Sequence, residues 1–151
     1  MHFNLHLHLH FSHLTMCIPM KQLTHESLTV YQRAIQFVAW ASEFATETKL
    51  TGVMSDQFKR AFVSIPLNIA EGCGKHSKKD QARFYDIARG SALECGACLD
   101  VLVAMRIAES QEVESGKQLL IEVVAMLTSL SRNIVADRVH EDTSAYEMHQ
   151  A

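Results

Sequence analysis

The sequence predicts an all-α protein, specifically an antiparallel up-down-up-down four-helix bundle. Apolar residues recur every three to four positions in four long segments between residues 28 and 137. The turns between these segments are short and polar, which places consecutive helices side by side and antiparallel. The same span contains no strict alternation of apolar and polar residues, the pattern that would indicate a β-strand.

The first two helices are expected at residues 28–48 and 56–72. Ser27 or Thr29 is the expected N-cap of the first, and Ser55 of the second. Trp40 lies off the centre of the first apolar stripe, so it is predicted to lie at the core boundary or to face a neighbouring subunit. The predicted inward-facing residues of these helices are Tyr31, Ala34, Ile35, Phe37, Val38, Ala41, Phe44, Ala45, Phe58, Phe62, Ile65 and Ile69.

Pro66 and two glycines shape the end of the second helix. Pro66 lacks a backbone N–H and presses against the carbonyl of Phe62, so the helix is expected to be disturbed there. Gly72 and Gly74 follow the last turn, where glycine commonly ends a helix. We also expect the side chain of Asn68 to bond to backbone groups that the proline releases.

The third and fourth helices are expected at residues 78–108 and 117–137, with a polar turn at 109–116. Ser77 is the predicted N-cap of the third helix, and Asp80 stands three residues later as in a capping box. The expected apolar or packing positions are Phe84, Ile87, Ala88 and Ser91 on the third helix and Leu120, Val123, Leu127, Leu130 and Ile134 on the fourth.

The chain of 151 residues is expected to form one domain at residues 27–138, with a histidine-rich tail at 1–26 and a second tail at 139–151. The first tail alternates His6, His8 and His10 with apolar residues. One hypothesis is a metal site on one face of a strand; the other, which we favour, is a disordered tail outside the fold. Met16 and Met20 offer later start sites.

Composition limits the classes of function. The net charge of −3 argues against nucleic-acid binding through bulk charge alone. The sequence has no run of 18 apolar residues and no evident secretory signal, and its four cysteines are too few for a disulfide scaffold. A cytoplasmic protein that does not contact the membrane is therefore expected.

The sequence offers weak signals for catalysis or a cofactor. Cys95 and Cys98 form a C-x-x-C, which can hold zinc or carry redox chemistry. The pair falls in the middle of a predicted helix and lacks a second ligand pair, so packing is the favoured interpretation. The chain also lacks a nucleophile elbow, a Walker loop and a dinucleotide fingerprint. We predict no enzyme, no cofactor and no metal.

Several polar residues accompany the apolar stripes of the second and third helices. A functional hypothesis makes Glu71 and Glu94 a carboxylate pair for acid–base chemistry or a di-metal site, although the Glu-x-x-His pairs of di-iron bundles are missing. The favoured hypothesis is a structural polar network of Asn68, Glu71, Ser91 and Glu94 that also ties Arg83 to a carboxylate.

The turn between the second and third helices is basic. It contains His76 and only one acid between residues 75 and 83, Asp80. One hypothesis is a surface for the phosphate backbone, aided by the positive end of the third helix; the other is a solvated turn. The candidate nucleic-acid-binding residues are Lys59, Arg60, Lys75, Lys78, Lys79 and Arg83.

The segments SIPLNIAEG (64–72), SKKD (77–80) and RFYDIARGSALE (83–94) resemble the bacterial four-helix-bundle proteins that intervening sequences of ribosomal RNA genes encode. The accessory variability protein of diversity-generating retroelements belongs to the same group. The resemblance implies the bundle fold and a non-enzymatic scaffold whose partners are RNA, DNA or a reverse transcriptase-like protein. The alternative is a structural or interaction protein with no nucleic-acid role.

Self-association is also expected. Residues 101–105 and 123–127 are consecutively apolar, so they place apolar groups on every face of the third and fourth helices. A lone bundle cannot bury all of this surface, so a partner surface is expected. The resemblance, and not the residues, implies that the homo-oligomer is a ring-shaped pentamer.

Overall fold

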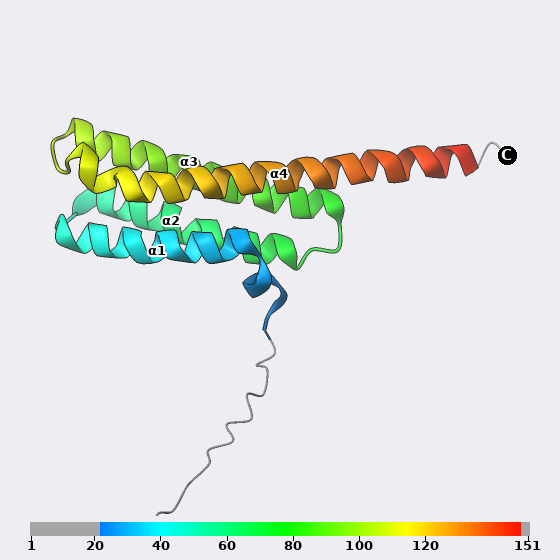
Figure 1. The fold of residues 1–151 in the computed structure, drawn as a ribbon, viewed down its shortest axis with the longest axis horizontal. Helices are drawn as coiled ribbons and strands as arrows, with labels where there is room; N and C mark the ends of the chain where they lie inside the picture. Colours follow the sequence, from blue (N-terminus) through cyan, green and yellow to red (C-terminus); the bar gives the residue numbers. More distant parts are fainter. Residues whose placement is uncertain (1–21, 149–151) are drawn as a thin grey trace, which may run out of the picture.

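The computed structural model describes residues 22–148, with side chains described for residues 22–134 and 136. It consists of the helices α1 (Thr29–Glu47), α2 (Gly52–Cys73), α3 (Lys78–Ala104) and α4 (Ser110–Met148), preceded by a 3₁₀ turn, η1 (Thr24–Ser27). No strand occurs in this part of the chain. The predicted all-α bundle is therefore confirmed (Figure 1).

The four helices alternate in direction along the bundle. In Figure 1, α3 and α4 form the upper half and α1 and α2 the lower half, and α4 extends past the α2–α3 turn. Each helix packs on the next in the sequence, and α1 also packs on α4, which closes the bundle. The two ends of the bundle are therefore chemically distinct, since one carries the α2–α3 turn and the other the α1–α2 and α3–α4 turns.

The core follows the predicted stripes with two exceptions. Phe37, Phe58, Ile65, Leu99 and Leu127 are among its fully buried side chains. Ile35 and Ile87 were expected in the stripes but are 43% and 40% exposed, because each lies one position away from the residues that face the partner helices. Tyr31, Val38 and Leu130 are partly buried against the core.

Several helix ends differ from the expected ones. α2 begins at Gly52, so Ser55 lies buried inside the helix and not at its N-cap. The N-cap of α1 is Leu28, without a side-chain bond. α3 ends at Ala104, and α4 begins at Ser110 and continues to Met148, past the end expected at residue 137. Residues 110–116, which were expected to lie in a polar turn, therefore form the first turns of α4.

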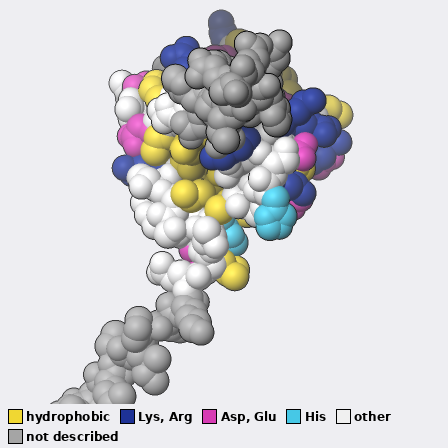
Figure 2. Space-filling view, turned by 90° about the vertical axis from the view of Figure 1, so that its right-hand side faces the viewer, with side chains coloured by type: hydrophobic (Ala, Val, Ile, Leu, Met, Phe, Trp, Pro, Cys, Tyr) yellow, Lys and Arg dark blue, Asp and Glu magenta, His cyan; other side chains and the backbone are white. Residues whose placement is uncertain are grey.

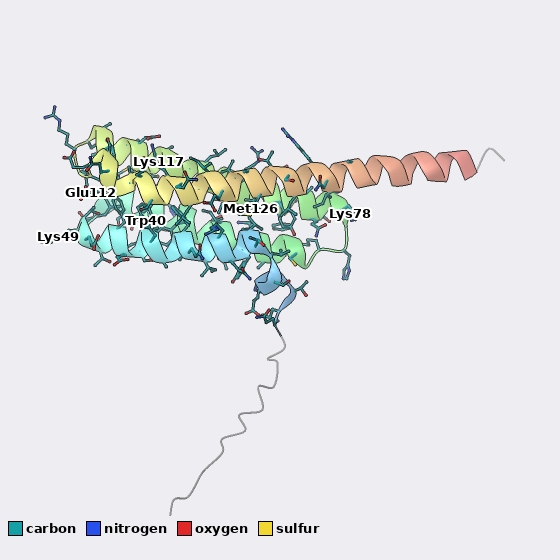
Figure 3. All side chains as sticks on the ribbon, in the orientation of Figure 1. Trp40, Lys49, Lys78, Glu112, Lys117 and Met126 are labelled. Atoms are coloured by element: carbon teal, nitrogen blue, oxygen red, sulfur yellow. The ribbon has the colours of Figure 1, made fainter. Side chains whose placement is uncertain are left out.

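Trp40 contacts its own bundle. Its ring stacks on Phe44 at 5.1 Å and on Phe37 at 5.7 Å between centroids. The other contact is Gly116 on α4, where an added Cβ would lie 2.1 Å from the indole Cζ3. Trp40 is thus half-buried at the core boundary, where the glycine admits its ring between α1 and α4 (Figure 3), and the alternative that it faces a neighbouring subunit stays a prediction.

α2 continues without a break through Pro66, which is buried. The expected role of Asn68 is also corrected. Its Nδ2 donates to the carbonyl of Ser64 at 2.8 Å and to the Oγ of Ser64 at 2.9 Å, whereas the carbonyl that the proline leaves without its usual partner is that of Phe62. The Asn68 amide therefore stabilises the helical turn that contains Pro66, but it does not bond to the carbonyl of Phe62.

Candidate nucleic-acid interface

The α2–α3 turn begins and ends as its sequence predicts. Gly74 is the C-cap of α2, and its N–H reaches the carbonyls of Ala70 and Glu71 at 3.2 Å. Ser77 is the N-cap of α3, and its Oγ accepts a hydrogen bond from the N–H of Asp80 at 3.3 Å. These caps fix a tight turn whose charged side chains point outward from one end of the bundle.

We call Lys75, Lys78, Lys79 and Arg83 the basic end. Lys78, Lys79 and Arg83 are exposed, and Lys75 is half-buried. Figure 2 looks onto this end and shows Lys and Arg side chains gathered on its right-hand side, with a few acidic ones among them. The positive end of the α3 dipole points the same way, so the helix adds to the attraction for an anion.

The members of the basic end differ in their intramolecular contacts. Lys75 forms an ion pair with Glu71, and its Nζ lies 4.8 Å from the ring centroid of Phe84. Lys79 and Arg83 are four residues apart on α3, so they share one face of the helix. A backbone phosphate on that face would meet both cations, while Lys75 would first have to exchange its own partner.

Lys59 and Arg60 do not lie at this end. They are on the earlier part of α2 and, with Val53 and Asp56, line a surface hollow of about 490 Å³. The fifteen residues from Lys59 to Gly74 correspond to about 22 Å of helix. The structure therefore separates two groups of cations that were assigned to one surface.

The predicted polar network is smaller than expected. Ser64 links Asn68 to Ser91, because the two serine hydroxyls lie 2.9 Å apart and Ser91 also donates to the carbonyl of Ile87 at 3.1 Å. Glu71 and Glu94 lie outside this group. Glu71 is exposed and pairs with Lys75, not with Arg83, and Glu94 is exposed and accepts a hydrogen bond from Gln57.

Cys95 and Cys98 are both buried, on the side of α3 that faces the core. Burial raises the pKa of the Cys95 thiol far above its ordinary value, and the neighbouring Cys98 and Glu94 act in the same direction. Burial and Glu94 also raise the pKa of Cys98. Since the thiolate is the reactive form, these groups behave as small apolar side chains at neutral pH.

Other features bear on ligands and membranes. Among the described residues, no three His, Cys, Asp or Glu side chains converge on a point where a metal ion would fit. His6, His8 and His10 lie outside the described residues, so the metal hypothesis for them stays untested. None of the helices between residues 22 and 148 is long and apolar enough to cross a membrane.

An apolar groove between α3 and α4 escaped the sequence analysis as a defined site. It has a volume of about 680 Å³, and Leu93 and Ile121 stand beside it, 53% and 61% exposed. The consecutive apolar residues 123–127 gave part of the signal, because they showed that α4 carries more apolar surface than the core uses. The groove itself depends on the register between α3 and α4, which cannot be predicted from the spacing of apolar residues along each helix.

The comparisons with known proteins agree on a family. The family model described as 23S rRNA-intervening sequence protein matches residues 26–129. A crystal structure of a protein of unknown function from the S23 ribosomal protein family of Bacteroides thetaiotaomicron is similar, with a TM-score of 0.63 and 25% identity over 68% of this chain and 97% of that chain. No curated protein matches the sequence. The match to the family model covers more than half of the chain, which therefore belongs to the 23S rRNA-intervening sequence protein family.

Proposed function

We propose that this protein is a non-enzymatic, self-associating binding module that contacts the phosphate backbone of nucleic acid through its basic end. The observation that carries the proposal is the placement of Lys78, Lys79 and Arg83 on the first turns of α3, with Asp80 as the only acid between residues 75 and 83. Cations at a helix N-terminus favour phosphate through both their own charge and the helix dipole.

A surface of this kind recognises the charge and spacing of the phosphates and not the base sequence, because its contacts go to phosphate oxygens. A single chain offers few such contacts. Self-association would therefore raise the affinity by presenting several basic ends to one nucleic-acid strand. The number of copies stays a prediction, and five copies in a ring is the number that the family resemblance implies.

The test measures binding of fluorescent RNA, DNA and RNA–DNA hybrids by anisotropy at low salt. We expect the wild-type protein to bind and the variant K75E/K78E/K79E/R83E to lose binding while its circular dichroism stays helical. The control is K59E/R60E, which reverses two exposed charges on α2, about 22 Å from the α2–α3 turn. This control should bind as the wild type does.

A wild-type protein that binds none of these nucleic acids contradicts the proposal. The alternative function, an interaction protein without a nucleic-acid role, would then stand. A loss of binding in K59E/R60E would also contradict the assigned site, since the effect would then follow total charge and not position.

A further inference from the structure

An open hollow lies beside the basic end, between η1 and the C-terminal part of α2. Its volume is about 380 Å³, within the range of about 300–1,000 Å³ that is common for small-molecule sites. Both apolar and charged side chains line it, and Lys75 belongs to the hollow as well as to the basic end. The residues that line the hollow are His25, Leu67, Ala70, Glu71, Gly74 and Lys75.

The apolar side of the hollow has no role in a surface that contacts only phosphates. Leu67 is 62% exposed and lies about two turns of helix before Gly74. His25, on η1, is half-buried in the same hollow. Figure 2 shows His and hydrophobic side chains on the end of the bundle that also presents Lys and Arg side chains. An imidazole ring and an apolar side chain are groups against which a nucleic-acid base stacks and packs.

Local contacts hold the His25 ring in place. The N–H of Leu23 donates to Oε2 of Glu26 at 2.7 Å, and the N–H of Leu28 donates to the carbonyl of His25 at 3.0 Å. The imidazole meets the Tyr31 ring at an angle of 70°, with 4.6 Å between the centroids. Because η1 is fixed in this way, little conformational freedom is lost when a planar ligand packs against the ring.

The polar side of the hollow is an ion pair. Glu71 and Lys75 lie four residues apart at the end of α2 and pair with each other. A carboxylate accepts hydrogen bonds from the exocyclic amino group of a base, and an ammonium group contacts phosphate. Since a nucleotide offers both an amino group and a phosphate, it can replace this one ion pair by two contacts. This exchange frees Lys75 to act with the other cations of the basic end.

We infer that this hollow binds an unpaired base of single-stranded nucleic acid and prefers a base that carries an exocyclic amino group. The inference rests on the proposed function and narrows its ligand. The basic end contacts the phosphates of the strand, and one base packs against His25 and Leu67. The amino group of that base donates to the carboxylate of Glu71.

A duplex offers phosphates to the basic end but no base to the hollow. Its bases are stacked and paired, whereas the bases of a single strand turn outward and stack on protein side chains. Binding therefore has two separable parts. The contacts at the basic end depend on salt and are shared by every nucleic acid, and the packing of a base in the hollow depends little on salt and is limited to single strands.

The first test compares oligo(dC) with a fully abasic strand of the same length by fluorescence anisotropy. We expect H25A/L67A to bind oligo(dC) about 5-fold or more weakly than the wild type, with an unchanged slope of log K against log salt. The affinity of this variant for the abasic strand and for duplex DNA should equal that of the wild type.

The control for this test is V53A/V63A, which removes two exposed apolar side chains of α2 outside the hollow, 81% and 43% exposed. It should bind all three ligands as the wild type does, and circular dichroism should show both variants to be equally helical. An affinity of H25A/L67A for oligo(dC) that equals that of the wild type overturns the inference. So does an equal loss for oligo(dC) and for the abasic strand.

The second test compares oligo(dC) with oligo(dU), because the amino group of cytosine is replaced by a carbonyl in uracil. The wild type should prefer oligo(dC), and Glu71→Ala should remove this preference. The same variant should bind the abasic strand more tightly than the wild type, because Lys75 loses its ion-pair partner. Equal affinities of the wild type for the two strands, or a preference that Glu71→Ala leaves unchanged, overturn the contact between Glu71 and the base.

The outcomes separate this inference from the proposed function. A wild-type protein that binds duplex DNA and the abasic strand, but binds oligo(dC) no more tightly than the abasic strand, overturns the base site and leaves the phosphate contacts of the basic end intact. A wild-type protein that binds no nucleic acid contradicts the proposed function, and the base site with it.

Discussion

The two ends of the bundle carry opposite charge. The end with the α2–α3 turn is basic, and the end about 40 Å away along α3 is acidic (Figure 3). At the acidic end, Trp40, Phe44 and nearby carboxylates line a hollow of about 400 Å³. The acidic end comprises Glu43, Glu47, Glu109, Glu112 and Glu114, accompanied by Lys49 and Arg106.

This difference shows that a net charge of −3 says little about how one surface meets a partner. The acidic end, which holds five of the chain's seventeen acids, is the end opposite the candidate interface. At 0.15 M salt the Debye length is about 8 Å, so the acidic end is screened from a phosphate at the basic end. Composition alone therefore excludes bulk-charge binding, but it does not exclude binding by the basic end.

The two ends also share a packing device. At each end an aromatic ring lies against a glycine of a neighbouring helix, Trp40 on Gly116 at the acidic end and Tyr85 on Gly72 at the basic end. Burial raises the pKa of the Tyr85 phenol, with a smaller contribution in the same direction from Cys73. The ring lies closer to the glycine at Gly116 than at Gly72, so a methyl group added at Gly116 should cost more stability.

The largest effect is expected for Gly116→Ala. The new Cβ would lie 2.1 Å from the Trp40 ring, and the ring is held on both sides by Phe37 and Phe44. Because the indole cannot move away without disturbing these neighbours, the substitution should cost about 3 kcal/mol or more of unfolding free energy. Urea unfolding measures it. A cost below about 1 kcal/mol would contradict the close approach of α1 to α4.

The next effect concerns the charge of the basic end. Replacing Lys79 and Arg83 together by Ala should lower the affinity for duplex DNA by about 10- to 100-fold. The slope of log K against log salt should also fall by about 2, one for each phosphate that the removed cations would neutralise. The companion variant, Glu43→Ala with Glu47→Ala at the acidic end, should change neither value. Equal changes in both variants would remove the distinction between the ends.

A smaller effect is expected for Gly72→Ala at the basic end. Its Cβ would lie 2.8 Å from Cε1 of Tyr85 and 3.1 Å from Cβ of Phe84. The approach is looser than that at Gly116, so we expect the free energy of unfolding to fall by about 1–2 kcal/mol in urea. A decrease larger than that of Gly116→Ala would reverse the order of the two ends.

The smallest effect has the opposite sign. Gly90 lies in the interior of α3, is exposed, and would place a Cβ with no atom within 4 Å. Replacing it by Ala should stabilise the protein by about 0.5–1 kcal/mol, because alanine has the higher helix propensity. Thermal unfolding checks this. A destabilised variant would contradict the open space around this position.

The helices themselves were predictable because periodicity reports local geometry. The N-cap of α3 was also predictable, since Ser77 acts through a bond three residues away. The start of α4 was not, because residues 110–116 are polar and look like a turn, whereas in the structure Val113 and Gly116 are buried against the rest of the bundle. Packing on neighbouring helices, not local propensity, makes that segment helical.

The candidate site was partly predictable for the same reason. Lys78, Lys79 and Arg83 lie within two turns of a helix, so the sequence alone places them together. Lys59 and Arg60 were grouped with them only because α2 precedes the turn, and the length of α2 separates them. Asn68 and Ser91 do meet, but through Ser64, whose position between two helices follows from tertiary packing.

The sequence by itself determined the fold class, the family and the basic α2–α3 turn, because each depends on residues close together in the chain. Only the tertiary structure decided which apolar residues are left exposed, that Trp40 packs on Gly116, and that Leu93 and Ile121 flank one groove closed by Asp100 and Lys117. These features depend on the register between helices, and register is set by how whole helix faces fit together, a property that no single segment carries.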